Sequence, residues 1–291
     1  GKLNDVQANK LLTNMQKIDE VFNPKQVANI TDMATGTGEL TPKGLAALRV
    51  MPNISIEIIL GLSEDSFKNK VNSASLDNFI KSYDWIKPPK LIRSNRWDSF
   101  YQSCTDKKID LIITLGDSRI VPENIINSFD VIGNHGAVLP HVQGGASLVW
   151  GRMLNNGEWG VSIMEIDKKI DSGRILKVKK FQYTSDCSEL EFTEICDDLT
   201  VDALLEVLRG DYTPIQNSKW QLKIAKHTDS YNVVNIFKYC IDNNINIYLP
   251  PRTPEDGLLK SEWSDEFKEV FKIANDKPYP QWKQNNLKTE L

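Results

Sequence analysis

The chain has 291 residues, of which 40% are hydrophobic and 25% are charged, and its 35 Lys and Arg against 39 Asp and Glu give a formal net charge of −4. A chain of this length is typical of about two domains and can bury a hydrophobic core without stabilisation by disulfides or bound metals. The acidic balance argues against a dedicated nucleic-acid binder, and no apolar run reaches the ~18 residues that a membrane span needs.

The N-terminus lacks the charged and then apolar pattern of a secretory signal peptide, so a cytoplasmic location is expected. The four cysteines show no CxxC spacing, which supports neither a structural metal site nor a disulfide framework. Histidine is scarcer still. His135, His141 and His227 are the three in the chain, so few side chains are suited to proton chemistry near neutral pH.

Helix and strand signals alternate along the chain. Residues 3–22 have apolar residues at helical spacing and predict an amphipathic helix that serves packing. Runs rich in β-branched or continuous apolar residues predict strands at 27–30, 54–60, 91–92, 109–115, 131–132, 160–166 and 174–181. Helices are predicted at 40–50, 97–104 and 185–209, and Ser188 and Glu191 have the spacing of a capping box at the start of the last one.

This alternation favours an α/β fold with a Rossmann-like, mostly parallel sheet. The nearly unbroken apolar run 109–115 is typical of a strand that is buried on both faces of such a sheet. Proline becomes frequent after residue 210. We therefore divide the chain into an N-terminal helical extension (1–26), a main α/β domain (27–210) and a smaller C-terminal region (211–291).

Gly36 and Gly38 follow the first predicted strand and could begin a dinucleotide-binding fingerprint, but Thr41 stands where the third glycine belongs. We interpret this segment as a strand-to-helix turn without a ligand. His135 has a more suggestive setting, because it follows the strand predicted at 131–132 and has Gly136 next to it. Ligands of open α/β sheets bind beyond the carboxyl ends of the strands, so this histidine is expected to face a crevice. The other two histidines are interpreted as surface or structural residues.

The sequence around His135 resembles the folate-dependent formyltransferase family. Several features recur at the family's spacing: Pro140 five residues after His135, the glycine-rich loop 144–146, Trp150, a strand start at Gly160, and Asp171 followed by Ser172 and Gly173. The resemblance covers about residues 27–210. The family's asparagine, two residues before the histidine, is replaced by Gly133, and an asparagine stands instead at the adjacent Asn134. Because neighbouring residues of a strand face opposite sides, we expect a glycine-permitted bulge to return this amide to the site.

The resemblance implies transfer of a formyl group from N10-formyltetrahydrofolate to an amine, with Asn134, His135 and Asp171 as the catalytic residues. Imidazole suits this reaction because the amine must lose a proton and the folate nitrogen must gain one. An amide N–H stabilises the oxyanion, and a carboxylate favours the charged imidazole. No metal site is implied. The residues expected to bind the folate co-substrate are Ser118, Arg119, Gly136, Leu139 and Pro140.

The stretch 248–257, with its Arg252-Thr253-Pro254 core, resembles a motif of the sugar N-formyltransferases, and Trp263 and the Pro-Tyr-Pro at 278–280 follow as in that branch. The implied acceptor is the amine of a UDP- or dTDP-linked amino sugar, used for surface polysaccharide or lipopolysaccharide. Region 211–291 would then form the acceptor side or a dimer interface, in a homodimer without nucleic-acid or membrane partners. The residues expected to bind this substrate are Gln143, Gly144, Tyr248 and Arg252. Only 81 residues follow Gly210 and the chain as a whole is acidic, and both facts argue against the transfer-RNA branch.

Two alternatives remain open at this point. The first is a formyl-folate hydrolase, in which water replaces the amine. Such hydrolases carry an N-terminal regulatory domain, for which we expect no room before residue 27. The second is a catalytically inactive protein on the same fold that binds sugar nucleotide or folate, and the displaced asparagine at 134 supports it.

Overall fold

The computed structural model describes residues 24–30, 40–61, 63, 76–85, 87–94, 96–117 and 119–275. The helix predicted at 3–22, the Gly36–Gly38 turn, Ser118 and the Pro-Tyr-Pro at 278–280 lie outside these residues. No helix within the described ranges is both long and apolar enough to cross a membrane.

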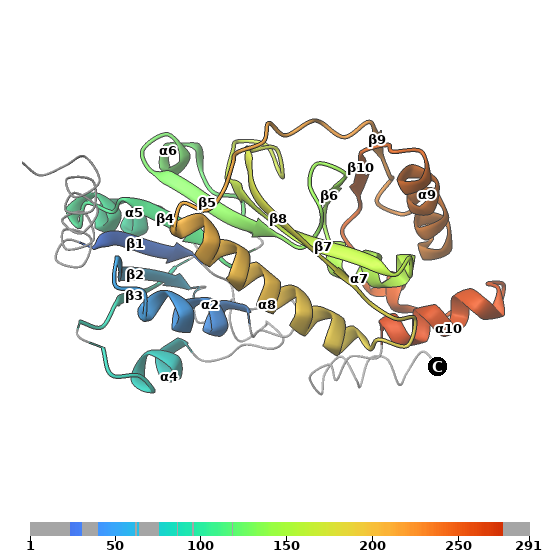
Figure 1. The fold of residues 1–291 in the computed structure, drawn as a ribbon, viewed down its shortest axis with the longest axis horizontal. Helices are drawn as coiled ribbons and strands as arrows, with labels where there is room; N and C mark the ends of the chain where they lie inside the picture. Colours follow the sequence, from blue (N-terminus) through green and yellow to red (C-terminus); the bar gives the residue numbers. More distant parts are fainter. Residues whose placement is uncertain are drawn as a thin grey trace, which may run out of the picture.

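A seven-stranded sheet with the order β3-β2-β1-β4-β5-β7-β8 forms the centre of the molecule (Figure 1). The first five strands in this order run parallel, and β7 and β8 are antiparallel to their neighbours. This confirms the mostly parallel α/β sheet that the sequence predicts. The strands are β1 (Lys25–Ile30), β2 (Ile54–Gly61), β3 (Lys90–Arg93), β4 (Leu111–Thr114), β5 (Asp130–His135), β7 (Glu158–Glu165) and β8 (Ile175–Gln182).

Helices cover both faces of this sheet. The α-helices are α2 (Leu40–Arg49), α4 (Leu76–Lys81), α5 (Asp98–Asp106), α6 (Glu123–Ile126), α7 (Ser147–Leu154), α8 (Glu189–Leu208), α9 (Ser230–Asp242) and α10 (Asp265–Ala274). The capping box is present: Ser188 Oγ accepts from the Glu191 N–H, and the Glu191 carboxylate accepts from the Ser188 N–H. The region after residue 210 is more regular than its proline content suggests, because α9 and α10 are both amphipathic helices with a buried side.

Side chains of β4 and β5 alternate between two apolar clusters. Ile113 and Ile132 pack with α2 and α8, whereas Ile112 and Val131 pack with α5 and α6 on the opposite face. The register of β4 and β5 continues this alternation to the carboxyl edge, where Thr114 pairs with Gly133. Positions 114, 133 and 135 therefore face the α5 side, and position 134 faces the α2 and α8 side.

A second, three-stranded parallel sheet joins the loop after β5 to the C-terminal region. Its strands are β6 (Val142–Gly144), β10 (Ile247–Leu249) and β9 (Leu222–Lys223), in the order β6-β10-β9. Gly144 has a φ of +101°, and a Cβ there would lie 2.2 Å from the Leu249 carbonyl oxygen, so only glycine fits this close approach. Helix α8 ends at Leu208, shortly before the boundary drawn at residue 210, and one apolar cluster contains residues from both sides of that boundary.

Candidate active site

His135 is the last residue of β5 and lies at the carboxyl edge of the parallel strands. Its side chain is buried, with 7% exposed. Nε2 lies 2.9 Å from the Val142 carbonyl oxygen, and Nδ1 lies 3.5 Å from Asp171 Oδ1. The first contact is a hydrogen bond and fixes the ring, whereas the second is longer than a good hydrogen bond. The structure thus brings the predicted histidine and carboxylate together.

Asp171 belongs to the loop between β7 and β8 and has a φ of +52°, in the left-handed region that few residues other than glycine adopt. Contacts on both sides hold it there. Its Oδ2 accepts from the Gly144 N–H at 2.8 Å, and its main-chain oxygen accepts from Asn217 Nδ2 at 2.9 Å. The carboxylate is therefore held between the imidazole and strand β6, where it can stabilise a protonated ring.

Asn134 does not join this pair. Strand β5 pairs with β7 in unbroken register from Ile132 to His135, so the bulge expected there does not form. The Asn134 side chain lies on the opposite face, where Oδ1 accepts from the Gly116 N–H at 3.1 Å. The expectation that its amide returns to the histidine is corrected accordingly, because an undistorted strand keeps adjacent side chains on opposite faces.

Thr114 occupies the space that a side chain at Gly133 would need. A Cβ at position 133 would lie 2.1 Å from Thr114 Oγ1 and 2.7 Å from Ile166 Cδ1. Sequence reasoning placed Thr114 within a buried strand and gave it no role. One signal in the sequence could have indicated it. Glycine stands at position 133 in place of the family's asparagine, and the missing side chain leaves space that a side chain from a neighbouring strand can occupy.

Gly133→Ala is expected to destabilise the fold by about 1–3 kcal/mol, because the added methyl group overpacks against Thr114 and Ile166. Denaturant unfolding of both proteins measures this difference. Gly257→Ala is the matched control, since a Cβ at Gly257 meets nothing within 4 Å. Equal stability of the Gly133 variant and the wild type would contradict the packing described above.

The residues expected to bind folate occupy two places. The Arg119 guanidinium is held by the Asp117 carboxylate, with a shortest contact of 2.6 Å, and lies 5.3 Å from the centre of the Trp97 ring. It also donates to the main-chain oxygens of Leu60 and Ser94, at the carboxyl ends of β2 and β3. The other group, Gly136, Leu139 and Pro140, lies in the loop that follows His135.

That loop is packed tightly against its surroundings. The Leu139 N–H donates to Ser162 Oγ at 3.0 Å, and Ser162 in turn donates to the Ala137 carbonyl oxygen at 2.7 Å. The peptide bond between Leu139 and Pro140 is cis. A Cβ at Gly136 would lie 2.9 Å from the Leu148 side chain. The loop therefore leads from His135 to β6 along a defined path.

Three of the four residues expected to bind the acceptor lie next to Asp171. Gly144 donates to its carboxylate, Gln143 is the preceding residue of β6, and Tyr248 is the partner of Gln143 on β10. The Gln143 amide donates to the Ser218 carbonyl oxygen at 2.8 Å. Burial, and then the negative charge of Asp171, raises the pKa of the Tyr248 hydroxyl above its ordinary value.

Arg252 has a different environment. Its guanidinium donates to Asn275 Oδ1 at 2.9 Å and to the Asp256 carbonyl oxygen, and it lies 5.6 Å from the centre of the Trp150 ring. None of these partners contacts His135 or Asp171. These contacts of Arg252 connect the loop after β10 to α7 and to the end of α10.

A row of aromatic and basic side chains extends from Tyr248 across the small sheet. Lys219 lies 4.8 Å from the centre of the Trp220 ring, the Trp220 and Tyr248 rings are 6.0 Å apart, and Lys223 lies 5.0 Å from the Tyr248 ring. We call these four residues the aromatic–lysine row. Sequence reasoning missed Trp220, although two lysines flank it within five residues. Both rings are half-buried and both lysines are exposed.

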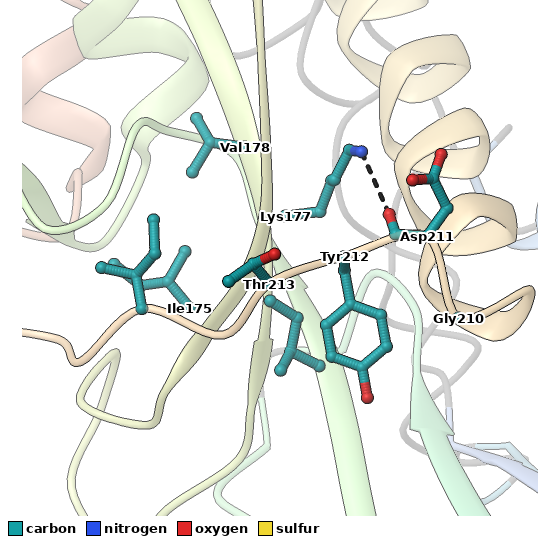
Figure 2. A pocket seen from close by; sticks show the side chains of 9 residues that line it. Ile175, Lys177, Val178, Gly210, Asp211, Tyr212 and Thr213 are labelled. Carbon is teal, nitrogen blue, oxygen red and sulfur yellow. Dashed lines mark hydrogen bonds between the residues drawn. The ribbon is translucent and has the colours of Figure 1, made fainter.

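A separate cavity of about 420 Å³ lies along β8 (Figure 2). It is lined by residues 175–178 of β8 and by residues 210–213 and 215, and Lys177 Nζ donates to the Asp211 carbonyl oxygen at 3.1 Å across it. None of the residues predicted from the sequence to form the site lines this cavity. In the described part of the chain, no group of three or more His, Cys, Asp or Glu side chains could hold a metal ion.

Comparison with known proteins gives three kinds of match. Residues 64–208 match the family model described as formyl transferase. The methionyl-tRNA formyltransferase of Limosilactobacillus fermentum is 30% identical over 158 residues, which are 52% of this chain and 48% of that protein. The chain thus spans about half the length of the curated relatives it matches.

Two solved structures share the fold over most of the chain. A sugar N-formyltransferase from Shewanella sp. is 13% identical with a TM-score of 0.55, covering 86% of this chain and 87% of that one. HypX from Aquifex aeolicus in complex with tetrahydrofolic acid is 14% identical with a TM-score of 0.53, covering 87% of this chain and 34% of that one. Residues 64–208 are therefore similar to formyl transferases, and His135 and Asp171 both lie within this matched segment.

Proposed function

We propose that the protein transfers the formyl group of N10-formyltetrahydrofolate to the amine of a nucleotide-linked amino sugar. The observation that carries the first half is the contact between His135 and Asp171 at the carboxyl end of β5, within the segment that is similar to formyl transferases. In the reaction, the amine nitrogen bonds to the formyl carbon, and the bond from that carbon to N10 of the folate breaks. One proton leaves the amine and one is gained by N10.

His135 is placed to move this proton. Nε2 is hydrogen-bonded to the Val142 carbonyl oxygen at 2.9 Å, so we assign the proton exchange with the substrates to Nδ1, which lies 3.5 Å from Asp171 Oδ1. The carboxylate then stabilises the positive charge that the ring gains when it accepts the proton. A positioned general acid and base of this kind is worth about 10²–10⁴-fold in rate.

Two observations favour a sugar nucleotide as the acceptor. The aromatic–lysine row begins at Tyr248, next to Asp171, and offers ring faces for a nucleobase and ammonium groups for a diphosphate. The chain as a whole is acidic, with a net charge of −4, which disfavours the large polyanion that a transfer RNA presents. The structural match to a sugar N-formyltransferase over 86% of the chain is in keeping with this choice.

A substrate panel tests the proposal. The full chain is incubated with N10-formyltetrahydrofolate and, in separate reactions, UDP- and dTDP-linked 3-amino and 4-amino sugars, methionyl-tRNA, or no amine. We expect tetrahydrofolate release only with an amino sugar, whose mass increases by one formyl group. Formylation of methionyl-tRNA alone would assign the protein to the activity of its curated relatives. Release without any amine would make it a hydrolase, and tight binding without turnover an inactive protein.

Trp220→Ala is expected to raise KM for the sugar nucleotide about tenfold, because loss of one stacking ring costs about 1–3 kcal/mol. The kcat and the KM for the folate should change little, since the Trp220 ring contacts Tyr248 and Lys219, whereas the His135 ring contacts Val142 and Asp171. Steady-state kinetics with each substrate varied in turn measure both. Tyr239→Ala, at a ring that is 59% exposed on α9, is the control. An unchanged sugar-nucleotide KM in the Trp220 variant would refute the assignment of the row.

A further inference from the structure

Formyl transfer requires a hydrogen-bond donor for the oxyanion that forms when the amine attacks the formyl carbon. Asn134, the expected donor, faces the opposite side of the sheet and binds the Gly116 N–H. The donor must therefore be found among other groups on the face that carries His135.

Most polar groups near His135 on this face are already engaged. Ser162, the partner of His135 on β7, donates its hydroxyl to the Ala137 carbonyl oxygen at 2.7 Å. The Gly144 N–H is taken by Asp171 at 2.8 Å. Both distances are those of good hydrogen bonds, so using either group for an oxyanion would require breaking an existing interaction.

Among the residues that the structure describes on this face, Thr114 differs from these two groups. It ends β4, pairs with Gly133 on β5, and faces the same side of the sheet as His135. Its side chain is buried, with 8% of the residue exposed. Within the described part of the chain, the hydroxyl has one hydrogen-bond partner, the Ile132 carbonyl oxygen, at 3.4 Å. That is well beyond the 2.7–2.8 Å typical of O–H···O bonds, so the proton is weakly held and free to turn.

The position of this hydroxyl is also informative. Oγ1 lies 2.1 Å from the point that a Cβ at Gly133 would occupy. It therefore stands where the side chain of the residue two before the histidine would begin, and the glycine at 133 is what admits it. Gly133 and Thr114 together place one hydroxyl donor at position 133, two residues before His135 and on the same face of the sheet, whereas Asn134 points to the opposite face.

We propose that the Thr114 hydroxyl donates a hydrogen bond to the oxyanion of the tetrahedral intermediate. This assignment rests on the proposed formyl transfer. As the amine nitrogen bonds to the formyl carbon, the carbonyl electron pair moves onto oxygen, and the Thr114 proton turns from Ile132 to this oxygen without being transferred. When the bond to N10 breaks, the carbonyl reforms and the hydroxyl returns.

Thr114→Val, which keeps the shape and removes the hydroxyl, and Thr114→Ser, which keeps the hydroxyl, test this proposal. In the full chain with its amine acceptor, Thr114→Val should lower kcat about 10²–10³-fold with both KM values within about threefold of wild type. Thr114→Ser should retain most of the rate. Thr200→Val, at a buried threonine of α8, controls for loss of a buried hydroxyl, and thermal unfolding checks that all variants are folded.

The outcomes separate the two proposals. A Thr114→Val protein that turns over as fast as wild type overturns the role of Thr114 and leaves formyl transfer standing. Equal losses in the valine and serine variants also overturn it, because the serine retains the donor. A wild-type protein that releases no tetrahydrofolate with any acceptor overturns both proposals.

Discussion

His135→Ala is expected to lower the rate of formyl transfer by about 10²–10⁴-fold, because the imidazole beside Asp171 is the group to which we assign proton transfer between the amine and the folate nitrogen. Binding of the folate should survive, since the loss removes one imidazole and leaves the strand and the loop after it in place. Single-turnover transfer and equilibrium binding of tetrahydrofolate measure the two quantities separately.

His227→Ala is the matched control for this change, because His227 is exposed and follows β9 in the C-terminal region. We expect it to retain wild-type transfer. A His135→Ala protein that keeps full transfer would remove the basis of the proposed mechanism. Loss of both transfer and folate binding would show instead that the ring contributes to the co-substrate site.

Asp171→Asn is expected to lower transfer by about 10²–10⁴-fold with little loss of stability. Asparagine has nearly the same shape and can still accept the Gly144 N–H through its amide oxygen, so the contact between this loop and β6 survives. The negative charge beside the His135 ring is lost, and the protonated imidazole is no longer stabilised. Steady-state rates and denaturant unfolding of the purified variant measure both effects.

Asp167→Asn provides the comparison within the same loop, because Asp167 is exposed and its Oδ1 accepts from the N–H of the adjacent Lys168. Its transfer rate should match wild type. If Asp167→Asn and Asp171→Asn lost activity equally, the effect would belong to the loop rather than to the carboxylate beside His135.

Much of the central fold could be predicted from the sequence because strands that are buried on both faces of a sheet appear as nearly continuous apolar runs. The run 109–115 is apolar since β4 is covered on both faces, and the predicted strand contains β4 at 111–114. The approach of His135 to Asp171 was also predictable, although only through the spacing of a family motif. Nothing in local sequence indicates that the loop after β7 folds back to reach the end of β5.

The orientation of Asn134 could not be predicted because it depends on one residue of strand register. A bulge and a regular strand are both compatible with the glycines around it, and they place the amide on opposite faces. Packing distinguishes the two conformations. Thr114 and Ile166 fill the space beside Gly133, and β5 keeps a regular register with both β4 and β7. Thr114 and Ile166 are distant from Gly133 in the sequence. The periodicity of the residues around Gly133 therefore does not indicate which side chains pack against it.

The small sheet could not be predicted either, for a related reason. Strand β9 has two residues and β6 and β10 have three each, too few to show a period. Their existence depends on segments more than a hundred residues apart pairing with each other, as Val142 does with Ile247. The aromatic–lysine row, which lies on β9, on β10 and just before β9, becomes visible only once that pairing is known.

Strand β6 contacts the side chains of His135 and Asp171 and also pairs with strand β10. Its Val142 carbonyl holds the His135 ring and its Gly144 N–H holds Asp171, while the same three residues pair with β10 on the other side. A small displacement of β10 would therefore carry both anchors of the imidazole with it. If the proposed acceptor binds at Tyr248, β6 would transmit that contact to the His135 ring, and binding energy from a remote part of the acceptor would be available for catalysis.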